Sequence, residues 1–182
     1  MDKSIGIAEY RSIAIGIGAV DMIVKAADVR LVDAKSICPG KYYIIFTGSV
    51  DAVKNSMARA ISETGDFLVD NAVIPNIYPE IFAAINQTSQ IGQLKAIGVV
   101  ETLTSPSIMV AADAAIKATA VELVEIRIAR ALGGKNTYII NGDVSSVKES
   151  VLSSIEYPER MGFLVDYQII PSPHKDFYRA IL

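Results

Sequence analysis

Cysteine, histidine and tryptophan are scarce or absent in this chain, and the scarcity of the first two argues against certain classes of function. The 182 residues include one cysteine, one histidine and no tryptophan. A single cysteine cannot form a disulfide within the chain, so a disulfide-rich secreted scaffold is excluded and a reducing, cytoplasmic setting is expected. His174 has no nucleophile at a recognisable spacing, and we expect it to be a solvated or interface residue. We therefore do not expect an enzyme or any catalytic residue.

Long apolar runs and basic clusters are also missing. The longest apolar stretch, residues 13–20, contains two glycines and is much shorter than the ~18 residues of a membrane-spanning helix. The first residues lead directly into a predicted strand, which argues against a secretory signal. The 17 Lys and Arg residues, against 20 Asp and Glu, are spaced singly, unlike a nucleic-acid-binding patch. We expect neither a membrane nor a nucleic-acid partner.

The sequence does contain an internal repeat. Many residues of the first half recur in the same order in the second half, including Ile5 and Ile97, Gly6 and Gly98, Glu9 and Glu101, Asp21 and Asp113, Lys25 and Lys117, Lys41 and Lys135, Val53 and Val147, and Asp70 and Asp166. This pattern indicates a duplicated domain. We predict a first domain at residues 1–86, a polar linker at 87–95 and a second domain at 96–182.

Hydrophobic periodicity predicts the same order of elements in both copies. In the first copy we expect strands at 4–9, 29–36, 42–47 and 67–74 and helices at 12–27 and 50–63. In the second copy we expect strands at 96–101, 121–131, 137–141 and 163–170, a helix with Ser105 as N-cap and Pro106 at its first position, and a helix at 144–154. A short helix should close each copy. The order β-α-β-β-α-β predicts an α+β fold of two tandem ferredoxin-like domains.

Few residue constellations suggest chemistry. Glu9 and Glu101 look like a carboxylate pair, but each ends a strand of its own repeat, so duplication accounts for them. The Gly133-Gly134-Lys135 segment lacks the spacing and the following Ser or Thr of a phosphate-binding loop, so it is interpreted as a turn. Lys25 and Lys117 each follow an aspartate at i−4, which predicts ion pairs worth a few tenths of a kcal/mol. Their equivalent positions leave room for a role at an assembly edge.

The single thiol lies in the stretch Ile37-Cys38-Pro39-Gly40-Lys41, between two predicted strands. A Pro-Gly pair favours a turn, so the sequence predicts that the thiol is presented in a loop rather than inside a sheet. The residues alone leave open whether that thiol does any chemistry.

Taken together, the motifs Ile-Gly-x-x-Glu, Asp-x-x-x-Lys-Ala, a glycine-rich turn and Val-x-x-Val-Lys resemble the bacterial microcompartment shell domain. The resemblance covers nearly the whole chain, twice. It implies a tandem-domain shell protein that forms a homotrimer imitating a six-domain tile and meets other shell proteins edge to edge. It also implies a central pore lined by Ile37, Cys38, Pro39 and Gly40 of one turn and by residues 131–134 of the other, namely Ala131, Leu132, Gly133 and Gly134.

Within that family, Ile-Cys-Pro-Gly-Lys and Gly-Gly-Lys resemble the iron–sulfur tandem shell proteins of propanediol-utilisation microcompartments. This resemblance implies that Cys38, one from each subunit, binds a [4Fe–4S] cluster on the threefold axis for electron transfer across the shell. A redox enzyme of the compartment is then a further expected partner. Lys25 and Lys117 match the family's tile-edge lysine, whereas Asn76 and Ser172 stand where an arginine often follows the last strand.

Two alternatives remain open at this point. The first is a shell tile with a metabolite pore, in which Cys38 is a free thiol and no cluster is bound. The second belongs to another class, a trimeric small-molecule sensor built on the same ferredoxin-like fold, because a fold does not determine a function.

Overall fold

Each repeat forms a four-stranded antiparallel sheet in the part of the chain that the computed structural model describes, residues 4–129, 132–174 and 176. The first sheet has the order β2-β3-β1-β4 and consists of β1 (Ser4–Tyr10), β2 (Val29–Ile37), β3 (Lys41–Gly48) and β4 (Leu68–Pro75). The second has the matching order β6-β7-β5-β8 and consists of β5 (Ala96–Thr102), β6 (Glu122–Ile128), β7 (Asn136–Gly142) and β8 (Leu164–Ile170). The predicted α+β class and the predicted order of elements are confirmed.

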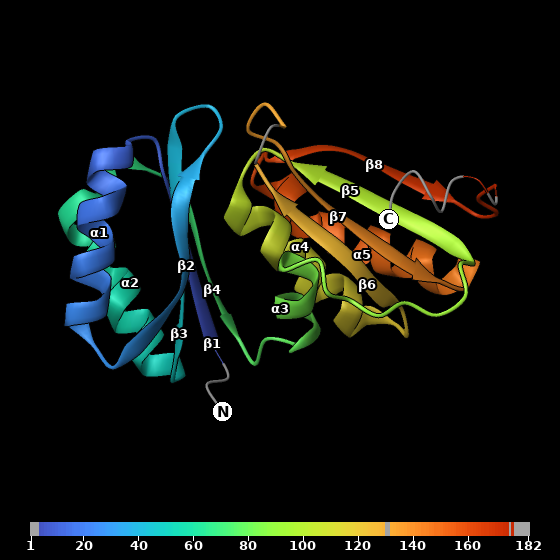
Figure 1. Cartoon of the computed structure of the whole chain (residues 1–182), viewed down its shortest axis with the longest axis horizontal. Coiled ribbons are helices and arrows are strands. Elements are labelled where there is room, and N and C mark those ends of the chain that lie inside the picture. Colours follow the sequence, from blue (N-terminus) through green and yellow to red (C-terminus); the bar gives the residue numbers. More distant parts are fainter. Residues whose placement is uncertain (1–3, 130–131, 175, 177–182) are drawn as a thin grey trace. The chain divides into compact units, whose positions relative to one another are not determined.

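Two long helices accompany each sheet (Figure 1). They are α1 (Ile13–Ala26) and α2 (Val50–Thr64) in the first repeat, and α4 (Ser105–Ala118) and α5 (Val144–Arg160) in the second. A buried serine joins the two helices of each pair. The Ser56 hydroxyl donates to the Ile23 carbonyl at 2.9 Å, and the Ser150 hydroxyl donates to the Ala115 carbonyl at 2.9 Å. The duplication therefore extends to the packing between helices.

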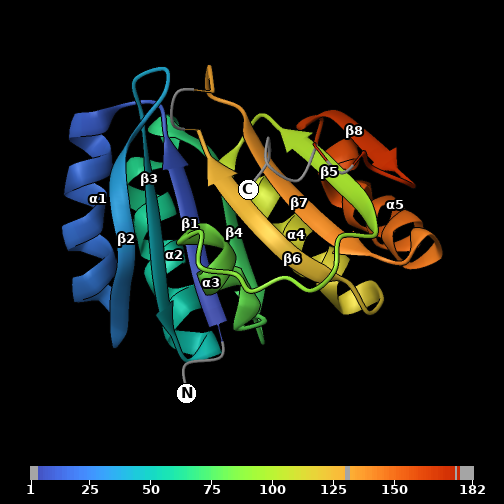
Figure 2. The ribbon, with the colours of Figure 1, turned by 45° about the vertical axis from the view of Figure 1, so that its right-hand side comes forward.

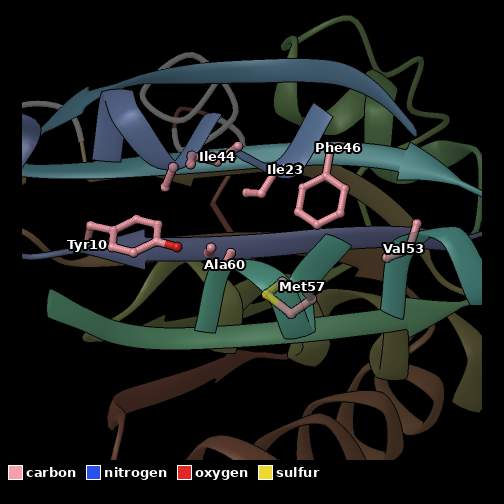
Figure 3. Close-up of a cluster of buried hydrophobic side chains, with 9 residues drawn as sticks. Tyr10, Ile23, Ile44, Phe46, Val53, Met57 and Ala60 are labelled. Carbon is pink, nitrogen blue, oxygen red and sulfur yellow. The ribbon is translucent and has the colours of Figure 1, made fainter. Parts of the chain in front are cut away.

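The core of the first domain lies between its sheet and its two helices (Figure 3). Its buried side chains include Tyr10, Ile23, Ile44, Phe46, Val53, Met57 and Ala60. Gly6 in β1 is required here because a Cβ atom would overlap the Phe46 ring. Gly98 has the same place in β5, where a Cβ atom would lie 2.6 Å from Val151 Cγ2. At each repeated Ile-Gly pair, neighbouring side chains therefore fill the space that a Cβ atom of the glycine would need.

The two compact units of the chain do not coincide with the two repeats. The first unit contains the first repeat up to Ile77, together with Thr104–Ser107 and the described residues of 129–135. The second unit contains most of the second repeat together with α3 (Glu80–Ile85), which packs against β6. The connection that follows α3 runs without regular structure to β5 (Figure 2). Each unit therefore includes chain segments from both repeats.

Several predicted boundaries differ from the structure. Helix α5 continues to Arg160 because Ile155 and Pro158 are buried, and this packing outweighs the cost of a proline near the last turn. Helix α4 begins at Ser105, and the Thr104 side chain accepts the Ser107 N–H at 3.4 Å, so Thr104 rather than Ser105 occupies the capping position.

Other boundaries concern the ends of the second repeat. Strand β6 ends at Ile128, short of the predicted 131, because Ala129 leaves the strand with a φ of 31°. The short helix predicted to close the first repeat is α3, whereas the one predicted for the second lies outside the described residues. No helix in the described part of the chain has the length and hydrophobicity needed to cross a membrane.

Candidate functional site

Cys38 lies in the tight turn that joins β2 to β3. The Gly40 N–H donates to the Ile37 carbonyl at 3.0 Å and closes the turn, and the Cys38–Pro39 peptide bond is cis. Gly40 has a φ of 81°, in the left-handed region that glycine adopts without strain. The Cys38 side chain is half-buried. The predicted turn is therefore present, and it holds the thiol at the end of the sheet rather than within it.

The equivalent turn of the second repeat packs against the Cys38 turn, as part of the first unit. The Cys38 N–H donates to the Ala129 carbonyl at 3.0 Å. A Cβ atom on Gly134 would lie 2.8 Å from Pro39 Cδ and 3.1 Å from the Cys38 carbonyl oxygen. Because Gly134 also has a φ of 86°, only glycine fits this position easily. Three of the residues predicted to line a pore, Cys38, Pro39 and Gly134, are thus brought together.

The other residues predicted to line a pore differ in exposure. Ile37 is buried at the end of β2, and Leu132 is half-buried and accepts the Lys135 N–H at 3.1 Å. Gly40 and Gly133 are exposed, and a Cβ atom built on either would meet no other atom within 4 Å. Each turn therefore has an exposed glycine. Ala131 lies outside the described residues.

Next to the Cys38 turn lies a group of charged residues with two buried carboxylates, Glu9 and Asp70, and the partly buried Lys41, which we call the first carboxylate seat. Lys41, the residue after Gly40, forms an ion pair with Glu9, whose side chain is fully buried. Strand pairing places Asp70 of β4 directly opposite Glu9 of β1. The Asn71 N–H donates to Asp70 Oδ1 at 2.8 Å. The ends of three strands thus bring two carboxylates and one ammonium group together.

The start of α4 fills this seat within the first unit. The Ser105 N–H donates to Glu9 Oε2 at 2.6 Å. The hydroxyl groups of Thr104 and Ser107 both donate to Asp70 Oδ2, the second at 3.0 Å. The unpaired N–H groups and the positive dipole end at the start of a helix favour nearby carboxylates. The seat therefore binds a helix start through backbone, hydroxyl and dipole interactions at once.

Burial raises the pKa of Asp70 above its usual value. Hydrogen bonds from Thr104, Ser107 and the Asn71 N–H act in the opposite direction, and the charge of Glu9 adds to the rise in this pKa. A pair of close carboxylates can serve acid–base catalysis. Here Asp70 is 7% exposed and Glu9 is not exposed at all, so a substrate would have to displace the helix start to reach them. The arrangement is one of structural recognition.

The sequence interpretation missed this role. It attributed Glu9 to duplication alone and did not single out Lys41 or Asp70. A signal was available, because all three charged residues recur in the second repeat as Glu101, Lys135 and Asp166. Three charged residues repeated in apolar surroundings indicate a requirement that strand formation alone does not impose.

The two lysines predicted at a tile edge have different environments. Lys25 is 72% exposed and pairs with Asp21 Oδ2 at 2.7 Å, beside a surface depression of about 460 Å³. Lys117 is partly shielded, pairs with the buried Asp113, and lies 5.9 Å from the centre of the Tyr78 ring. The Tyr78 N–H also donates to Asp113 Oδ1 at 3.3 Å. The predicted i,i+4 ion pairs are present, and the one in the second repeat is held in place by additional contacts.

His174 is exposed, and its Nδ1 accepts the Asp176 N–H at 3.3 Å. This agrees with the predicted solvated histidine. Among the described residues, no group of three or more His, Cys, Asp or Glu side chains is arranged to bind a metal ion.

Comparison with known proteins identifies the family. The model of the BMC domain matches residues 4–77 and again residues 96–173. The bacterial microcompartment shell protein PduT of Citrobacter freundii is 39% identical over 182 residues, which covers 100% of this chain and 99% of PduT.

Solved structures agree. The crystal structure of a microcompartment protein from Desulfitobacterium hafniense DCB has a TM-score of 0.86 and 41% identity, and the match covers 97% of this chain and 98% of that one. A fused permuted hexameric shell protein, MSM0275 of the RMM microcompartment, shares the fold at 20% identity, with a TM-score of 0.62 over 82% of this chain and 78% of that one.

These matches cover nearly all of both repeats and favour a shell tile over a small-molecule sensor. The relatives are shell proteins rather than enzymes, in agreement with the prediction that the chain is not an enzyme. The chain belongs to the BMC-domain family and is a tandem-domain shell protein of a bacterial microcompartment.

Proposed function

We propose that this shell protein forms a homotrimer whose six domains imitate a hexagonal tile, and that three Cys38 thiols at its centre hold a [4Fe–4S] cluster. The observation that carries this proposal is the turn itself. It presents a half-buried thiol at the end of the first sheet, against the equivalent turn of the second repeat. Six such turns, two from each chain, can then surround one axis.

The cysteine ligands of a cluster must come from several copies of the chain. A cubane cluster takes about four cysteine ligands, and each chain has one cysteine. Three chains supply three thiolates, so the fourth iron needs water, a small ligand or a group from a redox partner of the compartment. When bound, the cluster supplies one-electron transfer through the tile.

The backbone of the turn does not supply donors to the cluster sulfurs. The Cys38 N–H already donates to the Ala129 carbonyl, the Gly40 N–H donates to the Ile37 carbonyl, and Pro39 has no N–H. Hydrogen bonds to the sulfurs are one of the factors that set the reduction potential of a cluster. The turn therefore fixes the position of the thiol without adding this contribution.

Anaerobic purification tests the proposal. The wild-type protein should be brown, contain about four irons per trimer, and give an electron paramagnetic resonance signal after reduction. Cys38→Ser should lose the colour, the iron and the signal and should keep its oligomeric state in light scattering. Wild-type protein that binds no more iron than Cys38→Ser would contradict the cluster and favour the metabolite pore. A stable monomer at micromolar concentration would contradict the trimer.

We also propose that Lys25 and Lys117 contact neighbouring tiles. The exposed ion pair of Lys25 with Asp21 is worth little in water, so its ammonium group can exchange that partner for a carbonyl across a seam. Replacing both lysines with Asp should abolish sheet formation in electron micrographs and leave trimers intact. Sheets that persist in the double variant would show that these lysines are ordinary surface charges.

A further inference from the structure

The second repeat contains the two carboxylates of the seat again. Glu101 and Asp166 occupy the sequence positions of Glu9 and Asp70, and we call these two residues the second carboxylate seat. Strand pairing places Glu101 opposite Asp166, as it places Glu9 opposite Asp70. The Tyr167 N–H donates to Asp166 Oδ1 at 2.8 Å, the bond that Asn71 makes to Asp70. The local geometry of the two aspartates is therefore the same.

The two seats differ in what covers them. Asp70 is 7% exposed because the start of α4 lies on it, whereas Asp166 is exposed to solvent. The neighbouring side chains follow the same trend, since Ala72 on β4 is buried and its counterpart Gln168 on β8 is exposed. The second seat therefore presents an exposed aspartate at the position where the first seat has an aspartate covered by a helix start.

The first repeat contains the corresponding helix start, with Ser12 in place of Thr104 and the apolar Ile15 in place of Ser107. Residues 12–15 are the counterpart of residues 104–107. Ser12 accepts the Ile15 N–H at 3.4 Å, as Thr104 accepts the Ser107 N–H at 3.4 Å. The side chain of Ile17 on α1 is 55% exposed, whereas its counterpart Met109 on α4 is fully buried. The start of α1 thus has the shape and the apolar surface of a docked segment but is not covered.

We infer that the second carboxylate seat of one chain binds residues 12–15 of a second copy of this chain. By the geometry of the first seat, the Ser12 hydroxyl donates to Asp166 and the Ile13 N–H to Glu101. This inference rests on the trimer proposed above and specifies the seam between its chains.

The type of assembly depends on which two surfaces meet in this contact. The seat with the exposed aspartate belongs to the second repeat and the exposed helix start to the first, so the contact joins two different surfaces. A contact of this heterologous kind links chains head to tail and closes into a ring when the rotation permits, rather than forming a twofold dimer. The contact within each chain and the contact between chains are then chemically equivalent, which is what a pseudo-sixfold tile requires.

Replacing Ser12 with Asp tests the contact between chains without disturbing the fold of the protomer. Asp caps a helix about as well as Ser, so the protomer should stay folded, but its carboxylate would face Asp166 and Glu101. Like charges across an interface disfavour association strongly, so we expect the protein concentration at half-dissociation of the trimer to rise at least about tenfold. Ser49→Asp is the matched control, because Ser49 caps α2 in the same way, accepting the Ala52 N–H at 3.2 Å, and is exposed.

A second substitution tests direct contact. Asp166→Asn in the Ser12→Asp background should restore most of the lost association, while Asp166→Asn alone should weaken the trimer only slightly. Sedimentation velocity over a range of concentrations measures both, and circular dichroism checks the fold. If Ser12→Asp behaves like Ser49→Asp, or if Ser12→Asp and Asp166→Asn act independently, the proposed contact between the chains is wrong, whereas the proposed trimer is not contradicted. If wild-type protein is monomeric, the trimer itself is wrong, and the seam with it.

Discussion

Replacing Lys41 with Met should destabilise the protein more than replacing Glu9 with Gln, although both changes break the same ion pair. The Glu9 side chain is fully buried, whereas 15% of the Lys41 side chain is exposed. Removing one partner of a buried pair costs about 3–5 kcal/mol when the other charge is left uncompensated. Lys41→Met leaves a buried carboxylate, which still accepts the Ser105 N–H at 2.6 Å. That hydrogen bond offsets part of the cost, and we expect a loss of about 3 kcal/mol.

Glu9→Gln should cost less. The lysine stem can extend so that its ammonium group reaches water, and the glutamine oxygen can still accept the Ser105 N–H. We expect a loss of about 1–2 kcal/mol. The double variant Glu9→Gln/Lys41→Met should lose about 1–3 kcal/mol less than the sum of the two single variants, because the double variant removes both charges of the pair and leaves neither one unpaired.

Urea unfolding followed by circular dichroism measures all four proteins. The protomer concentration must be the same throughout, because self-association adds to the apparent free energy of unfolding. Equal losses for the two single variants would show that the exposed fraction of Lys41 does not matter. Additive losses would show that the ion pair contributes no coupling, and either result would refute the reasoning.

Three further predictions follow from buried positions. Gly6→Ala should lower the free energy of unfolding by about 1–3 kcal/mol in urea titrations, because its Cβ atom overlaps the Phe46 ring; unchanged stability would show that the ring moves freely. Asp70→Asn should change the dependence of stability on pH. Because the pKa of Asp70 is raised in the folded state, its contribution to the free energy of unfolding is full below the unfolded value of 3.8 and is lost as the pH rises through the folded value. The variant should therefore become more stable relative to wild type over that rise in pH. A constant difference between the two across this pH range would contradict the shift. Ser150→Ala should lower the free energy of unfolding by about 1 kcal/mol, because it removes the hydrogen bond to the Ala115 carbonyl. Replacing the exposed Ser62 with Ala should change the stability very little. Equal effects of the two substitutions on the thermal midpoint would contradict the role of the Ser150 bond.

The sequence by itself determined the duplication, the order of the elements and the turn that contains Cys38. These features depend on local preferences: alternation and helical periodicity set the strands and helices, and a Pro-Gly pair sets the turn. Repeated residues at matched positions, such as Gly6 and Gly98, then show that the same local preferences act twice. The family resemblance rests on the same repeated motifs.

Only the tertiary structure decided which copies of these motifs are covered. Asp70 and Asp166 each end an identical Phe-Leu-Val-Asp stretch, one in each repeat, yet Asp70 is buried and Asp166 is exposed. The difference comes from Thr104 and Ser107, which are distant in the sequence and reach Asp70 through folding of the whole chain. Burial and hydrogen bonding between distant residues are not encoded in the local pattern, so the covered Asp70 and the exposed Asp166 look alike in the sequence.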